Sequence, residues 1–373
     1  MKAQSARVAL LLAGLTASGA ALMGVTQMAA AQAAQPPQTS AASDATSGIA
    51  HQVELSGSIY ELAYDASSNS IYVAVGGAKG ETGQGRIVEL DASTLAIKRS
   101  IVTPTKNHGL YFSTRLNTLF TTNSRSGQLT AVRLGNDLSA STVTLVDPQQ
   151  AREGEHPVQP REIVAVPGSD SIYVTGVGFG DDGNSTIWKV NGRTLQIEET
   201  FEHVGKSVTG LAVAPDGKQL FATAMGSDEV LTLDQHGKVL KRFSSGGKRP
   251  LNIAYDAKGG RLFVVNSDSN TLAVLDSQSG KPIYTYPTSD MPISVRYDAD
   301  HQRLYVANRK GGDVDVIDSS TYQRIKRIPA PPMPNSVALD STHNRAFVTS
   351  RPSNAKDASD SDKHDGVYEI SVP

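Results

Sequence analysis

Nine residues carry side chains that could hold an anionic ligand. Guanidinium, ammonium and imidazole groups contact phosphate oxygens, and an aromatic ring offers a face on which a base can stack. These residues are scattered along the chain, so only a fold that returns repeatedly to one place could gather them. The candidate ligand-binding residues are Tyr60, Lys106, His108, Arg125, Arg161, Lys206, Lys248, Arg249 and Arg309.

Carboxylates occur in the same stretches of chain, and they leave a second interpretation open. A mixture of both signs of charge is typical of an ordinary solvated surface. Arg161 is the strongest single candidate, although a structural salt bridge with Glu162 or with a neighbouring blade would also explain it. The acidic residues concerned are Glu61, Glu162, Asp181, Asp182, Asp228, Glu229, Asp268 and Asp313.

The composition excludes several kinds of site. The chain has no cysteine, which removes disulfide scaffolds, cysteine nucleophiles, Cys-ligated zinc and iron–sulfur clusters. The near balance of 35 Lys and Arg against 37 Asp and Glu argues against binding nucleic acid through bulk charge, so a local patch must carry any such binding. We predict no metal, no cofactor and no catalytic residue.

An oxygen-rich set of residues keeps an enzyme open as an alternative. Glu61, Glu162 and Asn252 occupy one position of the internal repeat, and Asn335 stands one position earlier. Carboxylate and amide oxygens could bind a divalent cation, as a lactonase-like or metal-assisted hydrolase would require. The two carboxylates come from non-adjacent repeats, which weakens this alternative.

The elements that must position these residues are seven copies of one strand motif. Each copy has an aliphatic residue, then Tyr or Phe, then a short run of strand-forming residues. The aromatic residues are 48, 53, 48, 42, 42 and 42 positions apart, and an aliphatic residue stands ten positions before each. A period of this length with strand-type composition predicts propeller blades. The aromatic residues are Tyr72, Phe120, Tyr173, Phe221, Phe263, Tyr305 and Phe347.

The predicted fold class is all-β, a seven-bladed β-propeller. Four strand segments separated by turn residues make up each unit, and in the fifth they are 251–255, 261–266, 271–276 and 282–286. The last repeat lacks a fourth strand, whereas residues 51–56 precede the first inner strand. We expect this N-terminal strand to complete the last blade, because closure removes exposed sheet edges.

The N-terminal region is predicted to be a targeting segment. Lys2 and Arg7 precede a run rich in Ala, Leu, Gly and Val, and small residues follow it, which is typical of a secretory signal peptide. We expect a signal peptide over 1–33, a linker over 34–50 and the propeller over 51–373. The mature protein is then expected in the periplasm or secreted, with no membrane span after cleavage.

Two groups of motifs carry a family resemblance. Residues 304–308 (LYVAN) and 314–318 (VDVID) resemble the YVTN-type propeller repeat. Residues 157–164 (PVQPREIV), 172–178 (IYVTGVG) and 334–339 (PNSVAL) are similar to the periplasmic YncE-type propellers. This resemblance covers essentially all of 51–373 and implies an exported seven-bladed propeller of a group associated with single-stranded DNA binding.

The function expected first is therefore a non-catalytic binding protein, with single-stranded DNA or another polyanion held at one propeller face. A protein-interaction platform for an envelope partner is a further alternative, because the loops 147–158 and 351–366 are long and polar. We expect a monomer.

Overall fold

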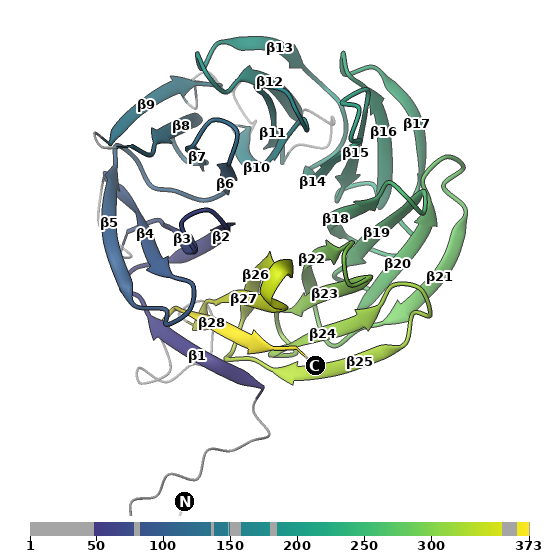
Figure 1. The fold of residues 1–373 in the computed structure, drawn as a ribbon. Helices are drawn as coiled ribbons and strands as arrows, with labels where there is room; N and C mark the ends of the chain where they lie inside the picture. The colour runs from purple at the N-terminus through teal and green to yellow at the C-terminus, as the bar shows by residue number, and fades with distance from the viewer. Residues whose placement is uncertain are drawn as a thin grey trace, which may run out of the picture. The chain divides into compact units, whose positions relative to one another are not determined.

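Seven antiparallel sheets of four strands surround a central axis (Figure 1). The computed structural model describes residues 48–77, 83–135, 138–147, 149, 158–179, 185–352 and 364–372. The predicted all-β propeller of seven blades is confirmed. The expected signal peptide and most of the expected linker lie outside the described residues. So do Asp181, Asp182 and most of the loops 147–158 and 351–366.

In each blade the strand nearest the axis is followed by three strands that lie progressively further out (Figure 1). Blades 1 to 3 comprise β2 (Ile59–Asp65), β3 (Ser70–Val75), β4 (Gly85–Asp91) and β5 (Ile97–Thr103); β6 (Leu110–Ser113), β7 (Thr118–Asn123), β8 (Gln128–Arg133) and β9 (Ser139–Thr144); and β10 (Gln159–Ala165), β11 (Ser171–Val177), β12 (Thr186–Asn191) and β13 (Ile197–Phe201).

The later blades are more regular in length, as the constant sequence period of 42 residues indicates. Blades 4 to 6 comprise β14 (Val208–Val213), β15 (Gln219–Ala224), β16 (Glu229–Asp234) and β17 (Val239–Ser244); β18 (Pro250–Asp256), β19 (Arg261–Asn266), β20 (Thr271–Asp276) and β21 (Pro282–Pro287); and β22 (Pro292–Asp298), β23 (Arg303–Asn308), β24 (Asp313–Asp318) and β25 (Arg324–Pro329).

The seventh blade joins the two ends of the chain. It contains β26 (Pro334–Asp340), β27 (Arg345–Ser350) and β28 (Gly366–Ser371), and its fourth strand is β1 (Ile49–Glu54). A short 3₁₀ helix, η1 (Ser341–His343), links β26 to β27. The predicted N-terminal closing strand is present, although it starts and ends two residues earlier than expected.

The repeated aromatic residues form the contacts between blades. All seven are essentially inaccessible to solvent, and each packs into the apolar cluster of the blade that follows it. Phe347 of the last blade packs among residues of the first, so the same contact also closes the ring. Burial of such a side chain contributes about 1.5–3 kcal/mol. The seven repeated aromatic residues therefore belong to the hydrophobic core.

A polar contact supports the apolar one where the ring closes. Arg345 of blade 7 donates hydrogen bonds to the backbone oxygen of Ala92 and to Asn69, both in blade 1, at 2.6 and 3.0 Å. Asp340 holds the same guanidinium at 2.6 Å. Asp340 thus orients the guanidinium within blade 7, and the two hydrogen bonds that Arg345 donates to blade 1 fix the relative position of the two blades.

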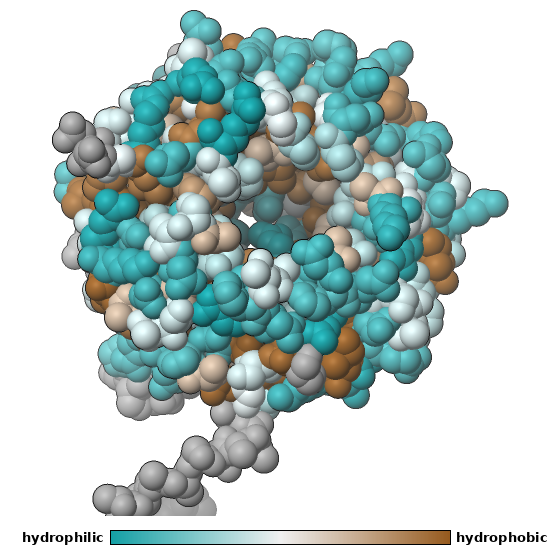
Figure 2. Space-filling model, viewed as in Figure 1, coloured by the Kyte–Doolittle hydropathy of each residue, from teal (hydrophilic) through white to brown (hydrophobic). Residues whose placement is uncertain are grey.

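A hollow opens at the centre of the ring, and both hydrophilic and hydrophobic residues surround it (Figure 2). Within the described residues no helix is long and apolar enough to span a membrane.

Candidate functional site

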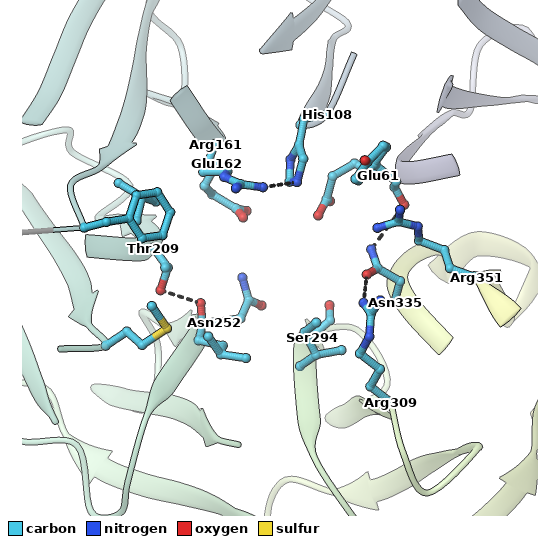
Figure 3. Close-up of a pocket in the computed structure, with 17 residues that line it drawn as sticks. Glu61, His108, Arg161, Glu162, Thr209, Asn252, Ser294, Arg309, Asn335 and Arg351 are labelled. Carbon is cyan, nitrogen blue, oxygen red and sulfur yellow. Dashed lines mark hydrogen bonds between the residues drawn. The ribbon is translucent and has the colours of Figure 1, made fainter. Parts of the chain in front are cut away.

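A cavity of about 340 Å³ lies on the axis where the inner strands begin and the second strands end (Figure 3). The inner strand of every blade contributes to it, which explains how residues so distant in sequence meet. Its lining residues are Tyr60, Glu61, His108, Gly109, Arg161, Glu162, Thr209, Leu251, Asn252, Ile293, Ser294 and Asn335 from the inner strands or just before them, and Val177, Phe179, Met225, Arg309 and Arg351 from the ends of second strands or just after them.

Irregularities of the inner strands direct these side chains toward the axis. In β10 the pairing with β11 shifts between Pro160 and Ile163, so Arg161 and Glu162 stand in the irregular segment. The equivalent shift in β2 contains Tyr60 and Glu61. Such bulges bend a strand and re-aim its side chains.

Buried threonines of the second strands stabilise this arrangement from blade to blade. The hydroxyl of Thr122 accepts a hydrogen bond from the Gly109 amide at 2.8 Å and donates one to the Arg161 carbonyl at 2.8 Å. Thr349 likewise donates to the Tyr60 carbonyl at 2.9 Å, across the junction of blades 7 and 1. The backbone of Arg161 and of Tyr60 is thereby tied to the neighbouring blade.

Three guanidinium groups line the cavity, and we call Arg161, Arg309 and Arg351 the arginine arc. Arg161 contacts His108 and donates to Gln159 at 2.9 Å. Arg309 donates to Asn335 (Figure 3).

Arg351 is the buried member of the arc. Its guanidinium lies 3.8 Å above the ring of Tyr60, and its Nε is 3.9 Å from the carboxylate of Asp365. That aspartate lies in the chain just before β28, and its carboxylate also accepts a hydrogen bond from the Ile59 amide at 3.1 Å. The same acidic residue therefore links the closing blade to the arginine arc.

Crowding of positive charge has a clear electrostatic effect. Burial and the nearby charge of Arg351 lower the pKa of Arg309 to about 10. The pKa of Arg161 is lowered by burial and by the charge of Arg351. Burial, followed by the charges of Arg161 and Arg351, holds the pKa of His108 well below its usual range, so this imidazole is neutral at pH 7. A bound anion would relieve the repulsion within the arc.

The cavity also contains two carboxylates, and we call Glu61 and Glu162 the carboxylate pair. Their side chains point toward the centre of the pocket (Figure 3). Arg296 lies between them, with Nη2 at 3.6 Å from Glu61 and 3.9 Å from Glu162, and its Nη1 is 3.3 Å from Asn252. Burial and the neighbouring Glu61 charge raise the pKa of Glu162 to about 7, against the opposing effect of Arg296.

The structure brings together four of the nine predicted ligand-binding residues, namely Tyr60, His108, Arg161 and Arg309. Lys106, Arg125, Lys206, Lys248 and Arg249 are not among the residues that line the cavity.

Two of those five bind acidic residues on the surrounding surface. Lys248 contacts Asp228 at 2.8 Å, and Arg249 lies 3.6 Å from Asp268. These pairs match the mixed solvated surface that the sequence left open. The predicted basic mouth is consequently smaller than the full set of nine residues.

Arg161 does not form the salt bridge with Glu162 that was the alternative explanation for it. Its guanidinium contacts His108 and Gln159, whereas Glu162 faces Arg296.

Two arginines were absent from the predicted set. Arg351 stands four positions after its repeat's aromatic residue, as Arg309 does, so the repeat register places both arginines at the same end of the second strand. Arg296 stands nine positions before its aromatic residue, and every other blade has an uncharged residue there. A lone charge in an otherwise uncharged column was therefore the signal for the residue that crosses the axis.

The described residues contain no group of three or more His, Cys, Asp or Glu that could hold a metal ion. The carboxylate pair, which suggested a cation site in the sequence, faces Arg296 instead.

Comparisons with known proteins connect the chain to the YncE proteins. It is 29% identical over 184 residues to the uncharacterized protein YncE of Escherichia coli K12, and 31% identical over 185 residues to that of Salmonella typhi. Each match covers 49% of this chain, and the chain spans about half the length of the curated relatives it matches. No family model matches.

Proposed function

We propose that this YncE-like seven-bladed propeller is an exported binding protein whose axial pocket holds an anionic group of single-stranded DNA or of another polyanion. One observation carries the proposal: three arginines face a single cavity, and Asp365 is the one carboxylate that the described residues bring within 4 Å of them. Support also comes from the resemblance to a group associated with single-stranded DNA.

The physical argument rests on the cost of gathering positive charge. Burial and mutual repulsion already lower the pKa values of Arg161 and Arg309, so gathering these charges is electrostatically unfavourable. A phosphate would receive charge-assisted hydrogen bonds from guanidinium groups in a partly dehydrated setting, where such bonds are strong. A cavity of about 340 Å³ lies within the range of small-ligand sites, so one phosphate-bearing residue of a longer polymer would enter it.

Binding of a fluorescent oligothymidine, followed by anisotropy at increasing salt, tests the proposal. Affinity should fall with salt, with a slope of about −0.7 for each phosphate neutralised. Arg309→Gln and Arg161→Gln should each weaken binding about tenfold, since each removes a charge-assisted hydrogen bond.

Lys248→Gln is the matched control, because Lys248 is exposed and bound to Asp228 away from the cavity. The proposal would be contradicted if the affinity did not change with salt concentration. It would also be contradicted if all three variants bound the oligonucleotide as tightly as the wild type.

A hydrolase is the second candidate, and the state of Glu162 favours it. A carboxyl group with a pKa of about 7 suits general acid–base catalysis near neutrality. Turnover of phosphate-ester or lactone substrates that disappears in Glu162→Gln, with the arginines intact, would support an enzyme. Binding without turnover would support the first proposal.

A further inference from the structure

The pocket contains two chemically different ends, and together they specify more than an anion. We propose that its ligand is a phosphate monoester of a hydroxyl-bearing sugar or polyol, with the phosphate on the arginine arc and the hydroxyl groups on the carboxylate pair. This inference rests on the proposed function and names the kind of group that the site selects.

The arginine arc marks the phosphate end. Arg161, Arg309 and Arg351 all line the cavity. The buried Nε of Arg351 has no hydrogen-bond partner among the described residues, because the Asp365 carboxylate stands 3.9 Å away. The positive charge of the arc is thus only partly paired within the protein, and phosphate oxygens in the cavity would pair the rest.

The number of charges favours a monoester over a diester. A phosphate monoester carries close to two negative charges at neutral pH and three free oxygens, whereas a phosphodiester carries one charge and two free oxygens. Even with the Asp365 carboxylate beside Arg351, the three guanidinium groups offer more positive charge than one diester can neutralise. A terminal phosphate therefore fits the arc better than an internal one.

The carboxylate pair indicates the second end. The Arg296 guanidinium stands 3.6 and 3.9 Å from Glu61 and Glu162, beyond the usual length of a hydrogen bond. The carboxylates therefore retain acceptor capacity toward the cavity, even though Glu61 also accepts from Ser336 at 2.9 Å. Hydroxyl groups are suitable donors to carboxylate oxygens.

Charge disfavours a second phosphate at that end. It would approach Glu61 and Glu162, and like charges at short range are unfavourable. Arg296 lies within 4 Å of both carboxylates and offsets part of the charge that would attract an ammonium group. An uncharged group rich in hydroxyls suits this end, and Asn252 and Ser294 in the lining add amide and hydroxyl partners.

Isothermal titration calorimetry with small probes tests the two ends separately. Ribose 5-phosphate contains both ends, methyl phosphate contains only the phosphate, and ribose contains only the hydroxyls. We expect ribose 5-phosphate to bind at least about tenfold more tightly than either single-ended probe, since each end adds about one net hydrogen-bond contribution or more.

Variants then assign each end to its residues. Arg309→Gln should reduce binding of ribose 5-phosphate and methyl phosphate alike. Asn252→Ala and Glu61→Gln should remove the advantage of ribose 5-phosphate while leaving methyl phosphate bound. Lys248→Gln should change neither, and thermal melts of every variant identify any that fail to fold.

The source of the monoester is settled by comparing a 5′-phosphorylated oligonucleotide with its 5′-hydroxyl counterpart. Preference for the phosphorylated strand end supports a polymer terminus, and tight binding of ribose 5-phosphate alone supports a small metabolite. The inference fails if methyl phosphate equals ribose 5-phosphate and the two oligonucleotides bind alike. Salt-sensitive oligonucleotide binding that still needs Arg309 would then leave the broader proposal of an anion site standing.

Discussion

Arg161 and Glu162 show how adjacent residues serve opposite ends of one pocket. Both stand in the irregular segment of β10, and both line the cavity. Arg161 contacts His108 in blade 2, whereas Glu162 faces Arg296 from blade 6. In a regular strand two successive side chains would point to opposite faces, so the bulge is what lets both reach the axis.

The raised pKa of Glu162 predicts how stability depends on pH. Its pKa moves from 4.5 to about 7 because of burial and Glu61, with Arg296 opposing. Between these values the folded protein binds more protons than the unfolded chain, so stability falls as pH rises through that window. The loss is at most about 3 kcal/mol. Thermal melts from pH 4.5 to 8 should show this decline in the wild type and a flatter profile in Glu162→Gln.

His108 changes the dependence of stability on pH in the opposite direction, so its effect must be separated from that of Glu162. Its lowered pKa means that the unfolded chain gains a proton below pH 6.5 that the folded protein does not, so this residue destabilises the fold as pH falls. The difference between wild type and Glu162→Gln isolates the glutamate, and the exposed Glu202→Gln serves as control. Parallel profiles for all three proteins would disprove the assigned effect.

The repeat register in the sequence indicates which residues reach the axis. Tyr60, His108 and Arg161 share one register position in successive blades, and all three line the cavity. The sequence did not predict which acidic residue pairs with each basic one. Lys248 is near the inner strand in sequence, yet Asp228 of the preceding blade binds it, and such contacts between blades depend on side-chain direction.

At the scale of single elements, hydrogen bonds between a second strand and the neighbouring inner strands position the residues of the site. Thr122 is fully buried in β7 and joins the amide of Gly109 to the carbonyl of Arg161. Four of the seven blades have threonine at this position, namely residues 122, 175, 223 and 349. In the sequence these threonines are only part of an apolar strand. Their role is not evident there, because their hydroxyls bond to backbone atoms in the irregular segments of the inner strands.

Thr122→Val should therefore destabilise the protein and also weaken the site. The substitution keeps the shape of the side chain but leaves a buried amide without its acceptor, which costs about 1–3 kcal/mol. Urea unfolding should reveal this loss, and affinity for the oligonucleotide should fall because Arg161 is less firmly held.

Thr122→Ser retains the hydroxyl and provides the matched control. It should keep the binding affinity even if the lost methyl group lowers stability slightly. Equal affinities for Thr122→Val and the wild type would show that the bridge does not position Arg161.

Strand positions followed from the sequence more closely than strand ends did. In blade 5 the predicted second and third strands coincide with β19 and β20, while β18 and β21 extend beyond the predicted limits. The extensions begin or end at proline or aspartate, which turn chemistry assigns to loops. Pairing with the neighbouring strand overrides that local preference.

At the scale of the whole molecule, the ring depends on contacts between residues at the two ends of the chain. β1 pairs with β28, and the Ser371 amide donates to the Gly48 carbonyl at 2.7 Å. The Leu55 amide donates to the backbone oxygen of Asp365 at 2.8 Å, and that residue's carboxylate stands beside Arg351. Closure of the ring and the geometry of the arginine arc are thus connected through one residue.

The closing strand was predictable because the last repeat has three strands and one strand is left over at the start of the chain. The arginine arc was less predictable, because the whole chain carries a net charge of −2 and many of its basic residues are paired with acidic ones. A one-sided cluster in a balanced chain emerges only when the ring assembles residues from several blades.

A covalent link across the closing strands tests this dependence directly. Val53 and Val367 are partners in the pairing of β1 with β28, and the Cα atoms of antiparallel partners are about 4.5–5.5 Å apart, within the range that a disulfide spans. Because the chain has no cysteine, the double variant Val53→Cys, Val367→Cys can form no other disulfide within the molecule. Linking the ends should stabilise the oxidised protein by up to about 5 kcal/mol relative to its reduced form.

The melting temperature of the double variant, measured with and without reductant, tests the effect of linking the two strands. Deletion of residues 49–54 tests the effect of removing the closing strand. The deletion leaves β28 as an exposed edge, so it should lower the melting temperature and promote aggregation. It should also weaken anion binding, because Asp365 loses support near Arg351, whereas the oxidised double variant should bind as the wild type does. Oxidised and reduced forms that melt alike, together with a deletion that melts as the wild type, would show that the ring does not need its closing strand.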